Sequence, residues 1–186
     1  DYFSSIRSLR SLSRCDVAIV VLDIFEGMTS YDKSLIDDAV KVGKGIIIAA
    51  NKWDLIEKDS LTSKRFEERI RQELPDKTEY PVIFISALSG QRVRKTLELA
   101  WRIGEARRFR AQTADFNRFI QSLHIPPAAG DIIIRYGVQH GIEPPSFVIF
   151  VNDPRKVKDS VLRYIEKCIR NEYRLEGTPV RLTCKK

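Results

Sequence analysis

The sequence has few cysteines: Cys15, Cys168 and Cys184 are the only three among 186 residues. An odd number of widely spaced cysteines among apolar neighbours predicts reduced packing residues, which excludes a disulfide framework and a cysteine-ligated metal site. No apolar run approaches the roughly 20 residues that a membrane-spanning helix needs, and no signal-peptide pattern is visible at the N-terminus. These absences predict a cytoplasmic protein. His124 and His140 have no carboxylate or cysteine at ligand or triad spacing, so structural roles are expected for both.

The composition is that of a globular protein, with 43% hydrophobic and 31% charged residues. The length allows one large domain or two small ones. The net charge of +7 is unevenly spread, because residues 1–110 carry 20 basic and 17 acidic side chains whereas residues 111–186 carry 12 and 8. The second part is therefore the more basic per residue, which permits contact with nucleic acid or an acidic partner.

One apolar run, residues 46–50, ends in the sequence Asn51-Lys52-Trp53-Asp54. A short run of branched apolar residues predicts a buried strand of a parallel sheet, and ligands bind beyond the carboxyl ends of such strands. An ionised Asp54 could accept the N1–H and N2–H groups of guanine, whereas adenine has no N1 donor. Asn51 could donate to the other edge of the base or brace the loop, and the Lys52 stem could cover the ring face.

A second strand end supports this interpretation. The apolar run 82–85 leads into Ser86-Ala87-Leu88-Ser89-Gly90, a turn of small residues that can bring backbone N–H groups close to a base. Two such strand ends separated by one helix predict the guanine-specificity half of a GTPase domain.

Hydrophobic periodicity predicts the elements of residues 1–109, the first domain. They are helices within 1–14, 30–42, 62–74 and 93–108, and strands at 17–23, 46–50 and 82–85. Alternating helices and strands predict a parallel sheet with helices on both faces, an α/β fold. Thr29 and Asp32 are predicted to form a capping box for the second helix, and Trp53 and Trp101 are expected to be packing residues.

The composition changes near residues 107–113, and residues 110–186 are predicted to form a second domain. The expected order is α-β-β-α-β, a small α+β sheet with helices on one face. The patterns place helices at 116–123 and 157–168 and strands at 132–138, 147–151 and 180–184, with breaks at the 126–130 loop and at Pro144-Pro145. The last helix has a basic face, which is either a nucleic-acid footprint or a solvated face partly neutralised by acids four residues earlier. That face consists of Arg163, Lys167, Arg170 and Arg174.

Several longer stretches resemble one protein family. They are Tyr2-Phe3-Ser4-x-x-Arg7-Ser8-Leu9-Arg10, Asp23-x-x-Glu26-Gly27-x-Thr29-x-x-Asp32, Asn51-Lys52-Trp53-Asp54, Ser86-Ala87-Leu88, Pro145-x-Phe147-Val148-x-Phe150-Val151-Asn152 and Leu175-Glu176-Gly177-Thr178-Pro179-Val180-Arg181-Leu182. Together they resemble the C-terminal portion of the Der (EngA) GTPases, in which a KH-like domain follows two tandem GTPase domains.

The resemblance implies part of a P-loop-NTPase-type GTPase domain followed by a KH-like domain. It implies GTP hydrolysis coupled to maturation of the large ribosomal subunit, with GTP or GDP and Mg²⁺ as cofactors. The implied partners are ribosomal RNA or ribosomal proteins, with docking between the GTPase and KH-like domains in a monomer. The implied guanine-binding residues are Asn51, Lys52, Asp54, Ser86, Ala87 and Leu88.

Two family features are missing from the sequence. There is no Gly-x-x-x-x-Gly-Lys-Ser/Thr loop and no Asp-x-x-Gly switch motif, both of which the family places upstream of the residue that is Asp1 here. We therefore expect no catalytic residue or Mg²⁺ ligand in this chain, weak binding of guanine nucleotide and no hydrolysis. Residues 116–186 also lack the Gly-x-x-Gly loop with which KH modules clamp nucleic acid, so sequence-specific reading of single strands is not expected.

Two classes of function remain open. The first is a nucleotide-switch enzyme whose GTPase state sets its affinity for the ribosome. The second is a non-catalytic RNA- or ribosome-docking module beside a remnant GTPase domain. The base preference of an Asp54→Asn variant tests the first, and the salt dependence of binding tests the second.

Overall fold

The computed structural model describes residues 10–57, 59, 61–74, 80–125 and 132–186. The predicted first helix is described only over residues 10–14, which are helical, and most of it lies outside the described residues, as do Pro75 and the 126–130 loop. The chain divides into two compact units. The first unit contains residues 1–105 with 176–178, and the second contains residues 106–175 with 179–186.

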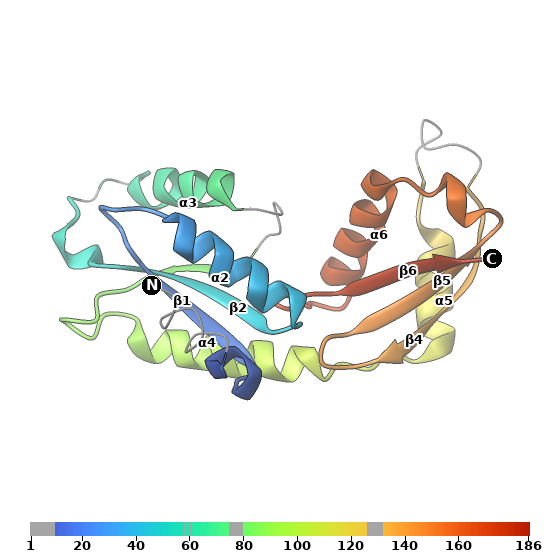
Figure 1. Ribbon diagram of the computed structural model, residues 1–186, viewed down its shortest axis with the longest axis horizontal. Helices are drawn as coiled ribbons and strands as arrows, with labels where there is room; N and C mark the ends of the chain where they lie inside the picture. The colour runs from blue at the N-terminus through green and yellow to red at the C-terminus, as the bar shows by residue number, and fades with distance from the viewer. Residues whose placement is uncertain (1–9, 58, 60, 75–79, 126–131) are drawn as a thin grey trace. The chain divides into compact units, whose positions relative to one another are not determined.

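The first unit is built on a parallel sheet, as predicted, and the order of its strands is β1-β2-β3 (Figure 1). Its strands are β1 (Val17–Asp23), β2 (Gly45–Asn51) and β3 (Val82–Phe84). The central strand β2 is buried on both faces from Gly45 to Ala50, which explains why its sequence is a continuous apolar run instead of an alternating one.

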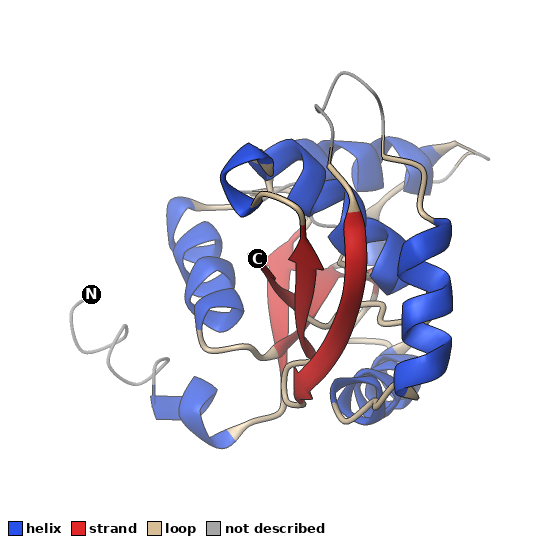
Figure 2. Ribbon diagram, turned by 90° about the vertical axis from the view of Figure 1, so that its right-hand side faces the viewer, coloured by secondary structure: helices blue, strands red, loops and turns tan. Residues whose placement is uncertain are grey.

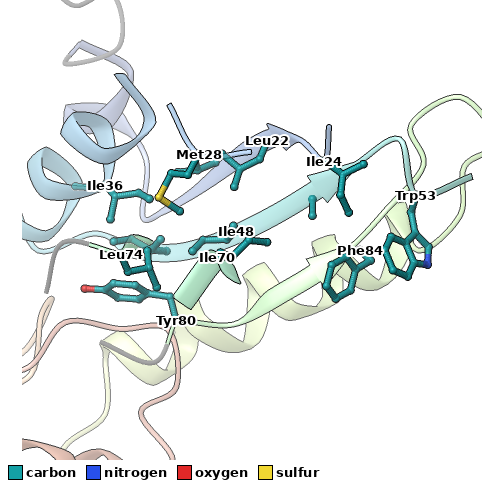
Figure 3. Packing of buried hydrophobic residues seen from close by; sticks show 14 of the residues in the cluster. Leu22, Ile24, Met28, Ile36, Ile48, Trp53, Ile70, Leu74, Tyr80 and Phe84 are labelled. Carbon is teal, nitrogen blue, oxygen red and sulfur yellow. The ribbon is translucent and has the colours of Figure 1, made fainter. Parts of the chain in front are cut away.

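Helices cover both faces of this sheet (Figure 1). They are α2 (Ser30–Lys41) and α3 (Thr62–Glu73) on one face and α4 (Val93–Arg107) on the other. The larger core lies under α2 and α3, where Leu22, Ile36, Ile48 and Ile70 pack together (Figure 3). The predicted capping box begins α2, since Thr29 N–H donates to an Asp32 carboxylate oxygen at 2.9 Å and Asp32 N–H donates to Thr29 Oγ1 at 3.2 Å.

One packing prediction for α4 was wrong. Leu99 and Ile103 pack against Ile47 of β2, as an inward helix face should. Trp101, however, is 74% exposed and Leu97 is 61% exposed. The helix is apolar on more than the one stripe that the three-stranded sheet can bury, so the excess apolar residues face outward.

A segment distant in sequence, residues 176–178, belongs to the first unit. Ile46 N–H donates to the Gly177 carbonyl at 2.7 Å, at the start of the central strand. Gly177 has φ +69°, and a Cβ placed there would lie 2.5 Å from Ile103 Cδ1 and 3.1 Å from the Ile46 carbonyl oxygen. Only glycine satisfies both the left-handed backbone and this close approach.

We expect Gly177→Ala to destabilise the first unit by about 2–4 kcal/mol, because it adds the strain of a left-handed alanine to overpacking against Ile103 and Ile46. Gly90→Ala is the matched control. Gly90 also has a positive φ of +75°, but nothing lies within 4 Å of its Cβ position, so only the backbone strain of about 1 kcal/mol is expected. Urea unfolding of both variants measures the difference, and equal destabilisation would contradict the packing role of Gly177.

The second unit has the predicted order α-β-β-α-β (strands red in Figure 2). Its elements are α5 (Thr113–Ser122), β4 (Ile134–Gly141), β5 (Ser146–Val151), the short 3-10 helix η3 (Pro154–Lys156), α6 (Asp159–Glu172) and β6 (Arg181–Lys185). The strand order is β4-β5-β6, with β4 antiparallel and β6 parallel to β5. Pro144 and Pro145 lie in the turn between β4 and β5, as the predicted break requires.

Both helices of this unit pack on one face of the sheet. Phe116 of α5 and Ile165 of α6 share a core with Phe147 and Ile149 of β5. Gly137 of β4 lies under α5, where a Cβ would be 2.7 Å from Phe116 Cε1 and from Ile120 Cδ1. Close approach of the helix to the strand therefore depends on the missing side chain.

The basic face predicted on α6 is smaller than its spacing suggested. The side chain of Arg170 is only 15% exposed and forms an ion pair with Glu166, whereas Arg163, Lys167 and Arg174 are exposed. The neutralising i,i+4 pair that the sequence allowed is thus formed at Glu166–Arg170.

Candidate functional site

The carboxyl ends of the three parallel strands of the first unit lie at the same edge of the sheet (Figure 1). Asp23 at the end of β1 is in register with Asn51 at the end of β2, and Ala50 is in register with Phe84 at the end of β3. The residues that follow these strands are therefore brought together. This is the edge at which open α/β sheets bind their ligands.

Hydrogen bonds join the two loops that the sequence singled out. Ala87 N–H donates to Asn51 Oδ1 at 2.9 Å, and Trp53 N–H donates to the Ile85 carbonyl at 3.0 Å. Of the two roles open to Asn51, the structure therefore shows the brace. With Oδ1 engaged, Nδ2 of Asn51 has no acceptor among the described residues and is the group that a ligand would meet.

The second loop has a defined shape. Ser86 N–H donates to the Gln91 carbonyl at 3.1 Å, and Ser89 N–H donates to Ser86 Oγ at 3.1 Å. Ser86 is fully buried and Leu88 is 91% exposed. Ser86 thus holds the turn, Ala87 ties the turn to Asn51, and Leu88 exposes its side chain on the turn.

The two residues after Lys52 point in opposite directions. Trp53 and Asp54 lie in a 3-10 helix, η1 (Trp53–Leu55). The Trp53 ring is buried, with its centroid 4.4 Å from that of Phe84 (Figure 3). The centroid of the Phe66 ring lies 5.9 Å from that of Trp53. Asp54 is exposed and has no hydrogen-bonding or ionic partner within the described part of the chain. The buried indole anchors the loop, and the carboxylate is left as an open acceptor.

Lys52 adopts a left-handed conformation, with φ +66°, which is unusual for a residue with a side chain. Its Nζ lies 2.5 Å from Asp23 Oδ2, and Asp23 also accepts the Phe25 N–H at 2.9 Å. The hydrogen bond from Lys52 and that from Phe25 hold the pKa of Asp23 below its ordinary value, and the same ion pair raises the pKa of Lys52. The ammonium is therefore anchored beside Asn51.

Asp23 is a residue of this site that the sequence-based prediction of the guanine site did not include. The available signal was an acidic residue at the end of an otherwise apolar strand, 28 positions before Asn51 and thus with no visible link to it. The link is the strand register, which pairs Asp23 with Asn51.

The described residues of this site include no group of metal ligands. Among the described residues, no three His, Cys, Asp or Glu side chains are placed to hold a metal ion. The phosphate-binding loop and the switch motif are missing from the sequence itself. None of the described helices is long and apolar enough to cross a membrane.

Comparison with known proteins gives a consistent family match. Residues 110–185 match the family described as KH-domain-like of EngA bacterial GTPase enzymes, C-terminal. The chain is 43% identical to GTPase Der of Desulforamulus reducens over 99% of its own length and 43% of that protein. It is 36% identical to GTPase Der of Chloroherpeton thalassium over 98% of its length and 43% of that protein. The chain thus spans less than half the length of the curated relatives it matches.

A solved structure gives a more distant likeness. The crystal structure of Era in complex with MgGDPNP and nucleotides 1506–1542 of 16S ribosomal RNA aligns with 95% of this chain and 66% of that chain, at 20% identity and a TM-score of 0.42. The chain is therefore similar over nearly its full length to the Der relatives, and its second unit matches the KH-domain-like family of the EngA GTPases, so it resembles the C-terminal region of the Der (EngA) GTPases.

Proposed function

We propose that the first unit recognises the guanine base of GTP or GDP. The observation that carries the proposal is the hydrogen bond between Ala87 N–H and Asn51 Oδ1, because it joins the two loops expected to flank the base. Asp54 accepts the N1–H and N2–H groups, and Asn51 Nδ2 donates to the base. The Lys52 stem covers the ring while its ammonium is held by Asp23. The turn of Ser86, Ala87 and Leu88 provides backbone N–H groups.

The intact protein, we further propose, hydrolyses GTP as a cytoplasmic monomer that acts in maturation of the large ribosomal subunit. The support is similarity to proteins named GTPase Der. The phosphate-binding loop, the switch motif and the Mg²⁺ ligands would come from parts of such a protein that this sequence does not contain. Mg²⁺ would neutralise the phosphates there. The KH-like unit would dock on ribosomal RNA or protein or on the GTPase domains.

The strand pairing and the exposure of β1 bear on this proposal. Among the described strands β1 pairs only with β2, so its other edge has no strand partner in the described part of the chain. Two apolar side chains on one face of β1 are exposed, Ile19 by 36% and Val21 by 55%. Parallel sheets are normally covered on both faces and rarely leave such residues in water. We propose that a further strand of the GTPase domain pairs with this edge in the intact protein.

Amide chemical shifts test base recognition in this chain alone. Titration with GMP is expected to perturb the amides of Lys52, Ala87 and Leu88 with a weak, millimolar affinity, since only the base half of a nucleotide site is present. AMP at the same concentrations is the control and is expected to leave these amides unchanged, because adenine has no N1 donor for Asp54. Equal shifts with GMP and AMP, or none with GMP, would contradict the proposal.

A further inference from the structure

The sheet of the second unit has one face that neither α5 nor α6 covers. Along β5, Phe147, Ile149 and Val151 are buried in the core shared with the helices, so Val148 and Phe150 belong to the opposite face. We call this opposite face the outer face. Strand register places its members in two rows across the three strands, Tyr136–Phe150–Lys185 and Val138–Val148–Thr183.

Two residues of the first row, Tyr136 and Phe150, are aromatic. The rings of Tyr136 and Phe150 are stacked, with centroids 4.3 Å apart and planes 14° apart. Tyr136 is nevertheless 46% exposed, so the stack is not sealed by neighbouring side chains. A cross-strand aromatic pair stabilises a sheet wherever it occurs, and that contribution alone would explain a stack between these strands. It does not explain the charges beside it.

The charge beside the aromatic row has one sign. Lys185 is in register with Phe150, and Arg181 lies on the same face of β6, four residues earlier. Both side chains are exposed. The two rows contain no acidic residue. The outer face therefore combines partly exposed aromatic rings, aliphatic side chains and, along β6, positively charged side chains.

We propose that the outer face binds single-stranded nucleic acid, whose bases stack on Tyr136 and Phe150 while its phosphates lie near Lys185 and Arg181. Base–aromatic stacking tolerates any sequence, and the cations follow the backbone. This mode needs no Gly-x-x-Gly clamp, which this chain lacks. The inference deepens the docking role proposed for the second unit and rests on it. It is independent of the guanine site, so the two can fail separately.

The test is fluorescence anisotropy of a labelled 12-nucleotide oligouridine with the 186-residue chain. Tyr136→Ala is expected to weaken binding about 5- to 100-fold, the range for loss of one base stack. Lys185→Ala is expected to reduce the slope of log K against log salt by about one. Tyr164→Ala is the matched control, because Tyr164 is an exposed tyrosine on α6, away from the outer face, and its removal is expected to change nothing.

A second substitution at Tyr136 and a duplex RNA ligand complete the test. Tyr136→Leu keeps apolar bulk on the strand and is expected to lose affinity as the alanine variant does, so a folding defect of one variant does not decide the result. Duplex RNA of the same length has no free bases and is expected to bind more weakly. The proposal is overturned if Tyr136→Leu binds like the wild type or if duplex RNA binds as tightly as the single strand. It is also overturned if no oligonucleotide binds at low salt, which is the result expected of a face that docks on protein.

Discussion

Replacing Asp54 with asparagine is expected to change the base preference from guanine to xanthine in the intact protein that carries this chain with a phosphate-binding loop. The side-chain oxygen of asparagine can still accept N1–H, but its amide group meets the N2 amino group of guanine donor to donor. Xanthine has a carbonyl at that position and accepts from the amide. Weakening one charge-assisted hydrogen bond to a neutral one and replacing the other by a donor–donor contact corresponds to a decrease in GTP affinity of about 10²–10⁴-fold.

The measurement is competition of GTP, XTP and ATP for the wild type and the variant. Glu57→Gln is the matched control, since Glu57 is an exposed acidic residue three positions further along the chain and its neutralisation should leave the preference for GTP intact. Retention of full GTP preference by Asp54→Asn would contradict the assignment of Asp54 to the base. A loss of all three nucleotides would indicate instead that Asp54 holds the loop.

The elements of the fold that could be predicted from sequence are those fixed by local chemistry. The run 46–50 had to be a buried strand because no exposed strand tolerates five consecutive apolar residues, and all five are buried. The Thr29–Asp32 cap needs only its own turn, and it forms as predicted. The Asn51 and Ser86 loops could be placed together because parallel strands end at one edge.

The features that could not be predicted depend on contacts between distant residues. Nothing near Lys52 indicates that its ammonium pairs with Asp23, because the strand register that joins them is set by the whole sheet. The close contact of Gly177 with Ile46 and Ile103 links positions more than 70 residues apart. For Trp101 a contact was expected that the structure does not contain. Helical spacing identifies an apolar stripe but does not show whether another element covers it.

Asn51 is expected to have two separable effects, which two variants can resolve. Asn51→Ala removes both the acceptor for Ala87 N–H and the Nδ2 donor. We expect faster hydrogen exchange of the Ala87 amide and a loss of guanine affinity of about 10- to 100-fold or more, since each lost hydrogen bond corresponds to roughly 1–3 kcal/mol. Asn51→Asp keeps an oxygen that can accept from Ala87 and replaces the Nδ2 donor with a charged acceptor oxygen.

The aspartate variant should therefore restore the slow exchange of Ala87 without restoring affinity for GMP. If it restores both, the Asn51 side chain acts on the base only by bracing the second loop, and the proposed contact from Nδ2 is wrong. If Asn51→Ala leaves the Ala87 amide protected, the 2.9 Å hydrogen bond is not what joins the loops. The Trp53 N–H to Ile85 carbonyl bond would then be sufficient for that role, because it crosses between the same two strand ends.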